Sequence, residues 1–174
     1  MENGELDFGR PSWMPPDDVL PAIVPAGQFL IRAEQIIVAL SHVSVYPNGC
    51  MLDVRAYSRG PAVAFDVFER MVFKVQFGAG ITAVMDDEEP WRRRSRGEPA
   101  LVLVQYGQEG NRGESSAEDR RVDSALRLWL YPLPPPEPGT LSVISPSLGP
   151  SSARCPLDGR AIVAAAAEAQ LYWP

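Results

Sequence analysis

His42 is the only histidine among the 174 residues, so a serine or cysteine nucleophile that needs a histidine base would have to use it. The sequence has no Gly-x-Ser-x-Gly turn to expose such a nucleophile. His42 also lies near a change of phase between two alternating apolar patterns, where a strand is expected to bulge or bend. We therefore expect a structural histidine and assign no catalytic residue.

The possible metal ligands are too scattered for a zinc site, since Cys50 and Cys155 lie far apart and only one histidine is present. The acidic run Asp86-Asp87-Glu88-Glu89 could offer oxygen ligands to Ca²⁺ or Mg²⁺, but it lacks the ligand spacing and the glycine of an EF-hand loop. We expect a solvated loop there, and reduced cysteines. No phosphate-binding loop or dinucleotide fingerprint is present, so we predict no metal and no cofactor.

Two clusters of aromatic and basic residues are candidates for binding a partner. In the first, Arg127, Trp129 and Tyr131 share one face of a predicted strand, and these residue types are enriched at protein interfaces. The alternative is that the N-terminal segment or a C-terminal helix covers this face. The second cluster consists of Trp91, Arg92, Arg93 and Arg94, followed by Arg96. These arginines could bind phosphates, although the neighbouring acidic run would compete for them.

The charge and composition limit the kinds of partner. The net charge is −6, with 16 basic and 22 acidic residues, which favours solubility and disfavours binding to nucleic acid. No apolar stretch approaches the ~18 residues of a membrane span, and the acidic start of the chain does not resemble a secretory signal. We expect a cytoplasmic protein with no nucleic-acid and no membrane partner. The bias toward Ala, Arg, Gly and Pro suggests a bacterial genome rich in GC.

Alternating apolar residues predict a mainly β protein. Residues 1–25 are rich in proline and should form an extended arm, and residues 26–174 should form one domain. The expected strands lie within 28–57, 63–77, 81–85, 101–106, 125–131 and 140–144. A phase change near Ser41 and His42 predicts a bulge, and Asn48-Gly49 predicts a tight hairpin turn through its tolerance of positive φ angles.

The remaining segments are predicted to be loops, a crossover and one helix. Residues 86–99 and 107–123 are polar and should form loops. The prolines of residues 132–138 favour polyproline II, which suits a rigid crossover between two sheets better than a Pro-x-x-P ligand for a partner domain. Asp158 can cap a C-terminal helix of about residues 158–173.

Three stretches resemble a family of uncharacterised bacterial proteins. They are PPDDVLP at residues 15–21, VQF at residues 75–77 and WLYPLPPPEPGTL at residues 129–141. The resemblance spans most of the chain from Pro15 onward. In the family an Asp-Gly pair follows the phenylalanine, whereas Gly78-Ala79-Gly80 stands here. The resemblance implies a shared architecture and no particular chemistry.

Several short strands, an arm and one helix predict a two-layer antiparallel β-sandwich. The missing nucleophile, metal and phosphate motifs favour a non-enzymatic protein-interaction or structural module, which could bind a protein partner or form a homo-oligomer. The predicted interaction residues are Arg127, Trp129, Tyr131, Trp91, Arg92, Arg93 and Arg94. The alternatives are a small-ligand binder or carboxylate-dependent hydrolase with a site at the sandwich rim, and nucleic-acid binding through the arginine cluster.

Overall fold

The computed structural model describes residues 10–59, 70–78, 80–85, 90–110, 121–145 and 153–173. Its strands are β1 (Val19–Leu20), β2 (Ala22–Arg32), β3 (Ile36–Tyr46), β4 (Gly49–Arg59), β5 (Val72–Phe77), β6 (Ile81–Val84), β7 (Ala100–Gly110), β8 (Arg121–Tyr131), β9 (Pro138–Ile144), β10 (Ala153–Asp158) and β11 (Gln170–Leu171). Its helices are α1 (Pro90–Ser95) and α2 (Gly159–Ala166).

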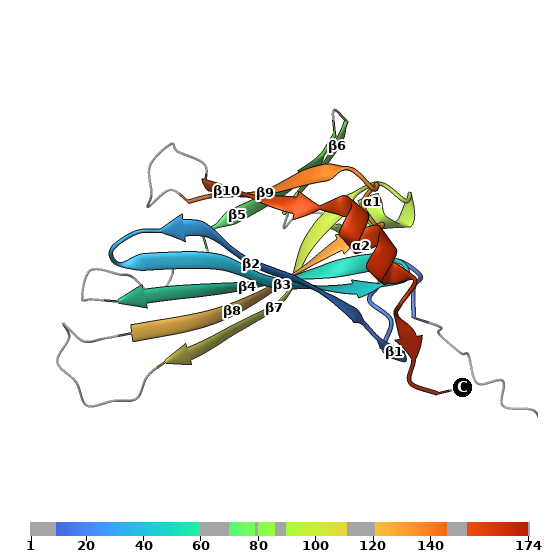
Figure 1. Cartoon of the computed structure of the whole chain (residues 1–174), viewed down its shortest axis with the longest axis horizontal. Helices are drawn as coiled ribbons and strands as arrows, with labels where there is room; N and C mark the ends of the chain where they lie inside the picture. The colour runs from blue at the N-terminus through green and yellow to red at the C-terminus, as the bar shows by residue number, and fades with distance from the viewer. Residues whose placement is uncertain are drawn as a thin grey trace, which may run out of the picture.

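Two antiparallel sheets form the two layers of the fold (Figure 1). One sheet has five strands in the order β2-β3-β4-β8-β7, and the other has four in the order β10-β9-β5-β6. Strands β1 and β11 form a separate two-stranded sheet near the C-terminal end. The predicted fold class, a mainly β sandwich with a C-terminal helix, is confirmed.

The core lies between the two sheets and follows the alternation of the sequence. Every second residue of β4 is buried there, and Phe73, Val75 and Phe77 of β5 face it from the other sheet. Because successive side chains in a strand point to opposite faces, the residues between them form the outer faces. Helix α2 packs against β2 and β3 on the side where β10 approaches β2.

The β3–β4 hairpin confirms the predicted bulge but changes the explanation of its turn. The register shifts between Leu40 and His42, as the phase change predicted. Gly49 pairs with Tyr46, so Pro47 and Asn48 form the turn, and neither Asn48 nor Gly49 has a positive φ. The predicted tight hairpin is therefore confirmed, but the positive φ angles expected of Asn48-Gly49 are not observed. A glycine is needed because a Cβ at Gly49 would lie 2.6 Å from the Trp129 ring.

Two of the predicted loops contain regular structure. Helix α1 lies within residues 86–99, and the acidic run before it is outside the described residues. Strand β7 continues to Gly110 and β8 begins at Arg121, so both extend into the loop predicted for residues 107–123. The longer strands are stabilised by pairing with each other, a long-range contact that local polarity does not reveal.

The C-terminal helix is shorter than the predicted 158–173. Asp158 caps it as expected, because its carboxylate accepts a hydrogen bond from the Ala161 N–H at 3.0 Å. The helix ends at Ala166, and Gln170 and Leu171 then pair with β1. Strand pairing prevails there over the helix propensity of the preceding alanines. Strand β10 was not predicted.

Proline-rich segments lie at the edges and connections of the sheets. The segment 132–137 joins β8 of the five-stranded sheet to β9 of the four-stranded sheet, which is the predicted crossover. The predicted arm ends earlier than residue 25, since edge strand β2 begins at Ala22. Pro25 is tolerated there because it adjoins a register shift in an edge strand.

Both cysteines are free and buried, and burial raises the pKa of the Cys50 thiol from 9.0 to about 12 and that of Cys155 from 9.0 to about 11. We expect both to react with a disulfide reagent at pH 8 at least ~100-fold more slowly in the native than in the unfolded protein, since thiolate is the reactive form.

Because the native pKa values of the two thiols are raised, the unfolded state loses these protons first as the pH rises. The free energy of unfolding should therefore fall between pH 9 and about 12.

Urea denaturation at several pH values will measure this loss. The control is the double variant Cys50→Ala, Cys155→Ala, in which other groups still titrate. Its stability should depend less steeply on pH above 9 than that of the natural chain. Equal slopes would contradict the prediction.

Candidate functional site

The N-terminal arm (residues 10–18) covers part of the face on which Trp129 was predicted to bind a partner. The Trp129 side chain is 0% exposed. Its indole Nε1–H donates to the Trp13 carbonyl oxygen at 2.9 Å, and its ring meets Tyr46 edge-on at 5.6 Å between centroids. Trp129 is thus an internal contact of the chain, which is the covered alternative considered above.

Two further side chains hold the arm in place. The Asn48 Nδ2 group donates to the carbonyl oxygens of Ser12 at 2.7 Å and Met14 at 2.8 Å. The Arg94 guanidinium lies over the Trp13 ring, 4.6 Å from its centroid. The arm is therefore fixed by one side chain each from the β3–β4 turn, from β8 and from α1, a set that sequence analysis did not connect.

The arginine cluster divides between buried and exposed positions. Arg94 is buried, and desolvation lowers the pKa of its guanidinium. Arg92 and Arg93, and Arg96 after the helix, are exposed on α1 and the following turn. The Trp91 side chain lies outside the described part of the chain. Arg94 thus has a structural role under the arm, which leaves fewer arginines for a phosphate-binding surface.

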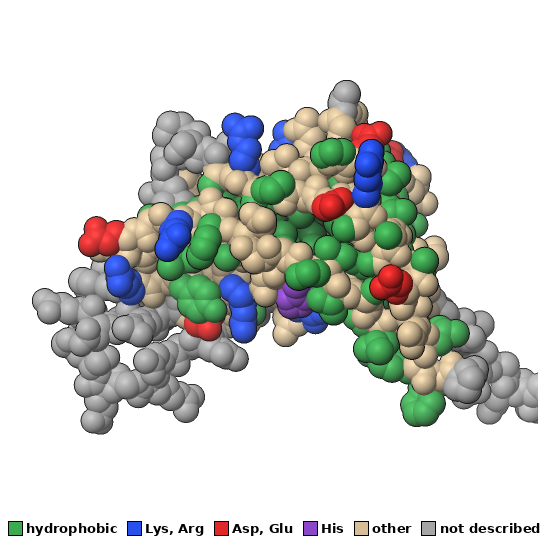
Figure 2. Space-filling view, viewed as in Figure 1, with side chains coloured by type: hydrophobic (Ala, Val, Ile, Leu, Met, Phe, Trp, Pro, Cys, Tyr) green, Lys and Arg blue, Asp and Glu red, His purple; other side chains and the backbone are tan. Residues whose placement is uncertain are grey.

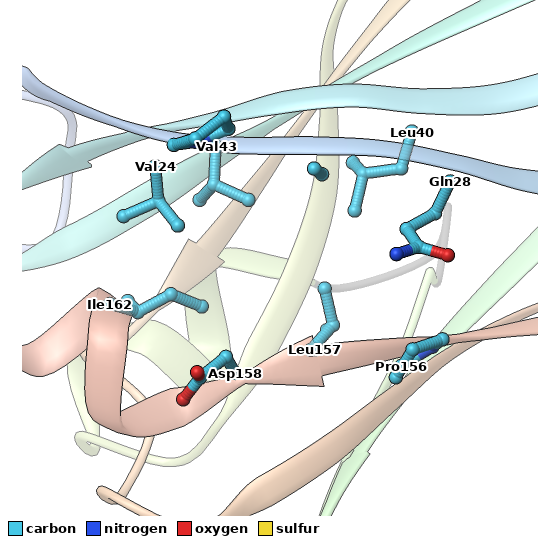
Figure 3. Close-up of a pocket in the computed structure, with 10 residues that line it drawn as sticks. Val24, Gln28, Leu40, Val43, Pro156, Leu157, Asp158 and Ile162 are labelled. Atoms are coloured by element: carbon cyan, nitrogen blue, oxygen red, sulfur yellow. The ribbon is translucent and has the colours of Figure 1, made fainter.

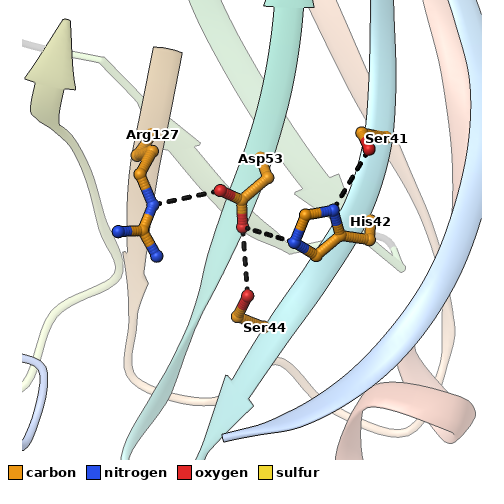
Figure 4. A network of polar contacts seen from close by, with 5 residues as sticks. All are labelled: Ser41, His42, Ser44, Asp53 and Arg127. Atoms are coloured by element: carbon orange, nitrogen blue, oxygen red, sulfur yellow. Dashed lines mark hydrogen bonds and ion pairs between the residues drawn. The ribbon is translucent and has the colours of Figure 1, made fainter. Parts of the chain in front are cut away.

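Asp53 is the centre of a polar network on the outer face of the five-stranded sheet (Figure 4). Its Oδ1 accepts from Arg127 Nε at 3.0 Å, and its Oδ2 accepts from Ser44 Oγ at 3.1 Å. The same Oδ2 lies 3.3 Å from His42 Nε2. Ser41 Oγ lies 3.1 Å from His42 Nδ1. Three adjacent strands, β3, β4 and β8, contribute these residues.

The Asp53 network has the residue types of a serine hydrolase but a different arrangement of roles. A hydrolase carboxylate serves chiefly to orient the histidine, whereas Asp53 also binds Arg127 and Ser44. Ser41 adjoins His42 in sequence at the bulge and is exposed on the sheet face. The network links the bulged strand to its neighbours, so it has the properties of a structural cross-strand contact. Arg127 is thus the second predicted interaction residue with a partner inside the chain.

Tyr131, the third residue of the predicted face, is partly buried and packs against the cluster of Val19, Tyr46, Met51 and Trp129. The three residues therefore lie on one side of the sheet, as the alternation of side chains along a strand predicted. Each of them, however, contacts other residues of the same chain. The sequence could not show this, because the contacts come from the arm and from strands β1, β3 and β4.

A pocket opens at the rim of the sandwich between β2, β10 and α2 (Figure 3). Its volume is about 150 Å³. Apolar side chains from both layers point into it, namely Val24, Leu40, Val43, Leu157 and Ile162. Gln28 and Asp158 supply its polar groups, and the Asp158 carboxylate already caps α2. The pocket suits a small apolar group better than a charged one.

No family model and no curated protein matches the chain. Within the described residues, no group of three or more His, Cys, Asp or Glu side chains is placed to hold a metal ion. No helix of the described structure is long and apolar enough to cross a membrane.

Replacing Asn48 with alanine should release the arm. The variant loses two side-chain hydrogen bonds to the arm, so we expect unfolding to become easier by about 1–3 kcal/mol. The indole N–H of Trp129 should also exchange faster with deuterium, because the carbonyl of Trp13 is no longer held against it. Urea denaturation and NMR of the indole signal will measure the two effects.

The matched control for this variant is Gln35→Ala, an exposed position in the β2–β3 turn. A surface change of this kind should alter stability by less than about 0.5 kcal/mol. An unchanged Trp129 exchange rate in Asn48→Ala would show that the turn does not hold the arm.

Proposed function

We propose that the protein is a non-enzymatic cytoplasmic interaction module that binds another protein chain. Its contact surface is the terminal ribbon, which we define as β1, β11 and the following residues Tyr172 and Trp173. The free thiols support a reducing compartment, and the net charge of −6 disfavours nucleic acid as the partner. We also propose that the chain shares the architecture of the uncharacterised bacterial family that it resembles.

The exposed apolar side chains of the terminal ribbon are the observation that carries this proposal. Leu20 is 50% exposed, Leu171 63%, Tyr172 53% and Trp173 77%. Figure 2 shows hydrophobic side chains gathered over this region, at the lower right. The ribbon is held in shape by the Val19–Leu171 pairing and by the bond from Tyr172 N–H to the Asp18 carbonyl oxygen at 2.8 Å. A fixed cluster of large apolar and aromatic side chains is typical of a binding surface.

The sheet edges are less suited to a partner than the ribbon: three of the four edge strands contain prolines or register shifts, and the fourth, β6, has only 4 residues. Edge strand β2 contains Pro25 and two register shifts, and edge strand β10 contains Pro156. Edge strand β7 has a register shift between Leu103 and Gln105. Such features prevent another strand from adding to the sheet. Side chains of the ribbon, not backbone groups of the edges, are therefore the proposed contacts.

Replacing Leu171 and Trp173 together with serine should weaken partner binding. Each side chain contributes about 1.5–3 kcal/mol if it becomes buried, so binding should weaken at least tenfold. Affinity capture from a lysate of the native cells, followed by mass spectrometry and titration of the recovered partner, will measure this effect. Sedimentation of the purified protein will show whether the partner is a second copy.

The control for the ribbon variant is Ile144→Ser, which removes an apolar side chain of 51% exposure from the four-stranded sheet. It should leave binding unchanged. A partner that binds the ribbon variant and the natural chain equally well, or the lack of any partner and of self-association, would contradict the proposal.

A second candidate function, binding of a small apolar ligand, is favoured by the rim pocket. Addition of indole should shift the NMR methyl signals of Val24, Leu157 and Ile162, which line the pocket. Ala26→Leu should fill the opening and weaken binding at least tenfold, while Ala39→Leu, on the other face of the sheet, should not. Shifts spread evenly over the methyl groups of the core would exclude the pocket as the site.

A further inference from the structure

The outer face of the four-stranded sheet carries a polar depression of about 440 Å³. We call it the basic depression because Lys74 and Arg154 line it together with Gln76, Thr140 and Ser142. None of the described residues that line it is acidic, although the chain as a whole has a net charge of −6. Its volume lies within the range of about 300–1,000 Å³ usual for ligand sites.

The register of the sheet brings the charged residues together. Ser142 of β9 pairs with Arg154 of β10 on one side and with Lys74 of β5 on the other. Neighbouring strands lie about 4.8 Å apart, so the two cations flank the serine in one row. Thr140 and Gln76 are paired in the next row on the same face. The five side chains come from three segments of the chain that only this topology makes adjacent.

The two cations have no counter-charge of their own in the described structure. Neither Lys74 nor Arg154 has an ion-pair partner among the described residues. The two cations are two strands apart, about 10 Å at the usual strand spacing, so an anion placed over Ser142 would interact with both. The carboxylate of Glu137 lies against Gly78, which is one of the residues that line the depression. The depression therefore has two cations and no acidic residue among the described residues that line it.

We propose that the basic depression binds a small phosphorylated molecule. The phosphate would lie over Ser142, between the guanidinium of Arg154 and the ammonium of Lys74, since both groups are strong phosphate ligands. Ser142 Oγ donates to the Lys74 carbonyl at 3.3 Å, a long bond that a phosphate oxygen can replace. Thr140 and Gln76 provide neutral donors and acceptors for hydroxyl groups of the same ligand. This site is separate from the terminal ribbon and does not depend on the proposed protein partner.

The test is a titration of the full chain with glucose 6-phosphate, followed by NMR of the backbone amides. Inorganic phosphate, glucose and sodium chloride of equal ionic strength are titrated in parallel. We expect shifts centred on Lys74, Ser142 and Arg154, with glucose 6-phosphate binding more tightly than inorganic phosphate and glucose not binding. Equal shifts with sodium chloride, or no gain over inorganic phosphate, would overturn the proposal.

Charge variants distinguish the site from a general effect of net charge. Arg154→Gln and Lys74→Met should each weaken binding at least tenfold, whereas Arg55→Gln removes the same charge from an exposed position of the other sheet and should not. Glu137→Gln should strengthen binding severalfold, because it removes the border carboxylate. All four positions are partly or fully exposed, so melting temperatures should change little. Equal weakening by Arg55→Gln and Arg154→Gln would refute a local site.

Discussion

The burial of the Trp129 indole is the constraint on which much of this molecule depends. A ring with no exposed surface must have its N–H group satisfied inside the protein, because an unpaired buried donor is costly. The partner is the backbone of the arm at Trp13. Asn48 and Arg94 then hold the arm in place. Residue 49 must be a glycine, because a side chain there would collide with the Trp129 ring.

This constraint also decides which surfaces remain for function. The arm covers the outer face of the five-stranded sheet next to the β3–β4 turn. The polar side chains of the Asp53 network occupy the middle of the same face. Among the described residues, the outer face of the other sheet carries an open polar depression, and the side chains that line it include two cations and no carboxylate. The terminal ribbon has the opposite character, with its large side chains apolar and exposed. A polar ligand and a protein partner would therefore use different parts of the fold.

The sequence predicts the strands well because alternation is a local signal. The core face of β4, the buried side of β5 and the bulge at Ser41 and His42 all follow from spacing alone. The end of the last helix, the end of β7 and the start of β8 do not, because strand pairing with distant residues decides them. Local propensity is only a weak guide where tertiary contacts compete with it.

The candidate sites were harder to predict for the same reason. The sequence placed Arg127, Trp129 and Tyr131 on one face correctly, but it could not show that the arm and Asp53 would occupy that face. Lys74 and Arg154 are 80 positions apart, and only the strand order β10-β9-β5 makes them neighbours. Nothing in their immediate sequence distinguishes them from ordinary surface residues.

The pairing of distant segments also has a consequence for how the chain folds. The bond between Trp129 and Trp13 spans 116 residues, and β1 pairs with β11 near the far end of the chain. Contacts of such long sequence separation form late, because the entropy of closing the intervening loop is lost before the contact is gained. During synthesis on the ribosome, the arm emerges long before Arg94 and Trp129, two of the residues that hold it. The arm can therefore make all its contacts only after Trp129 has been synthesised, and β1 can pair only after β11 has been synthesised.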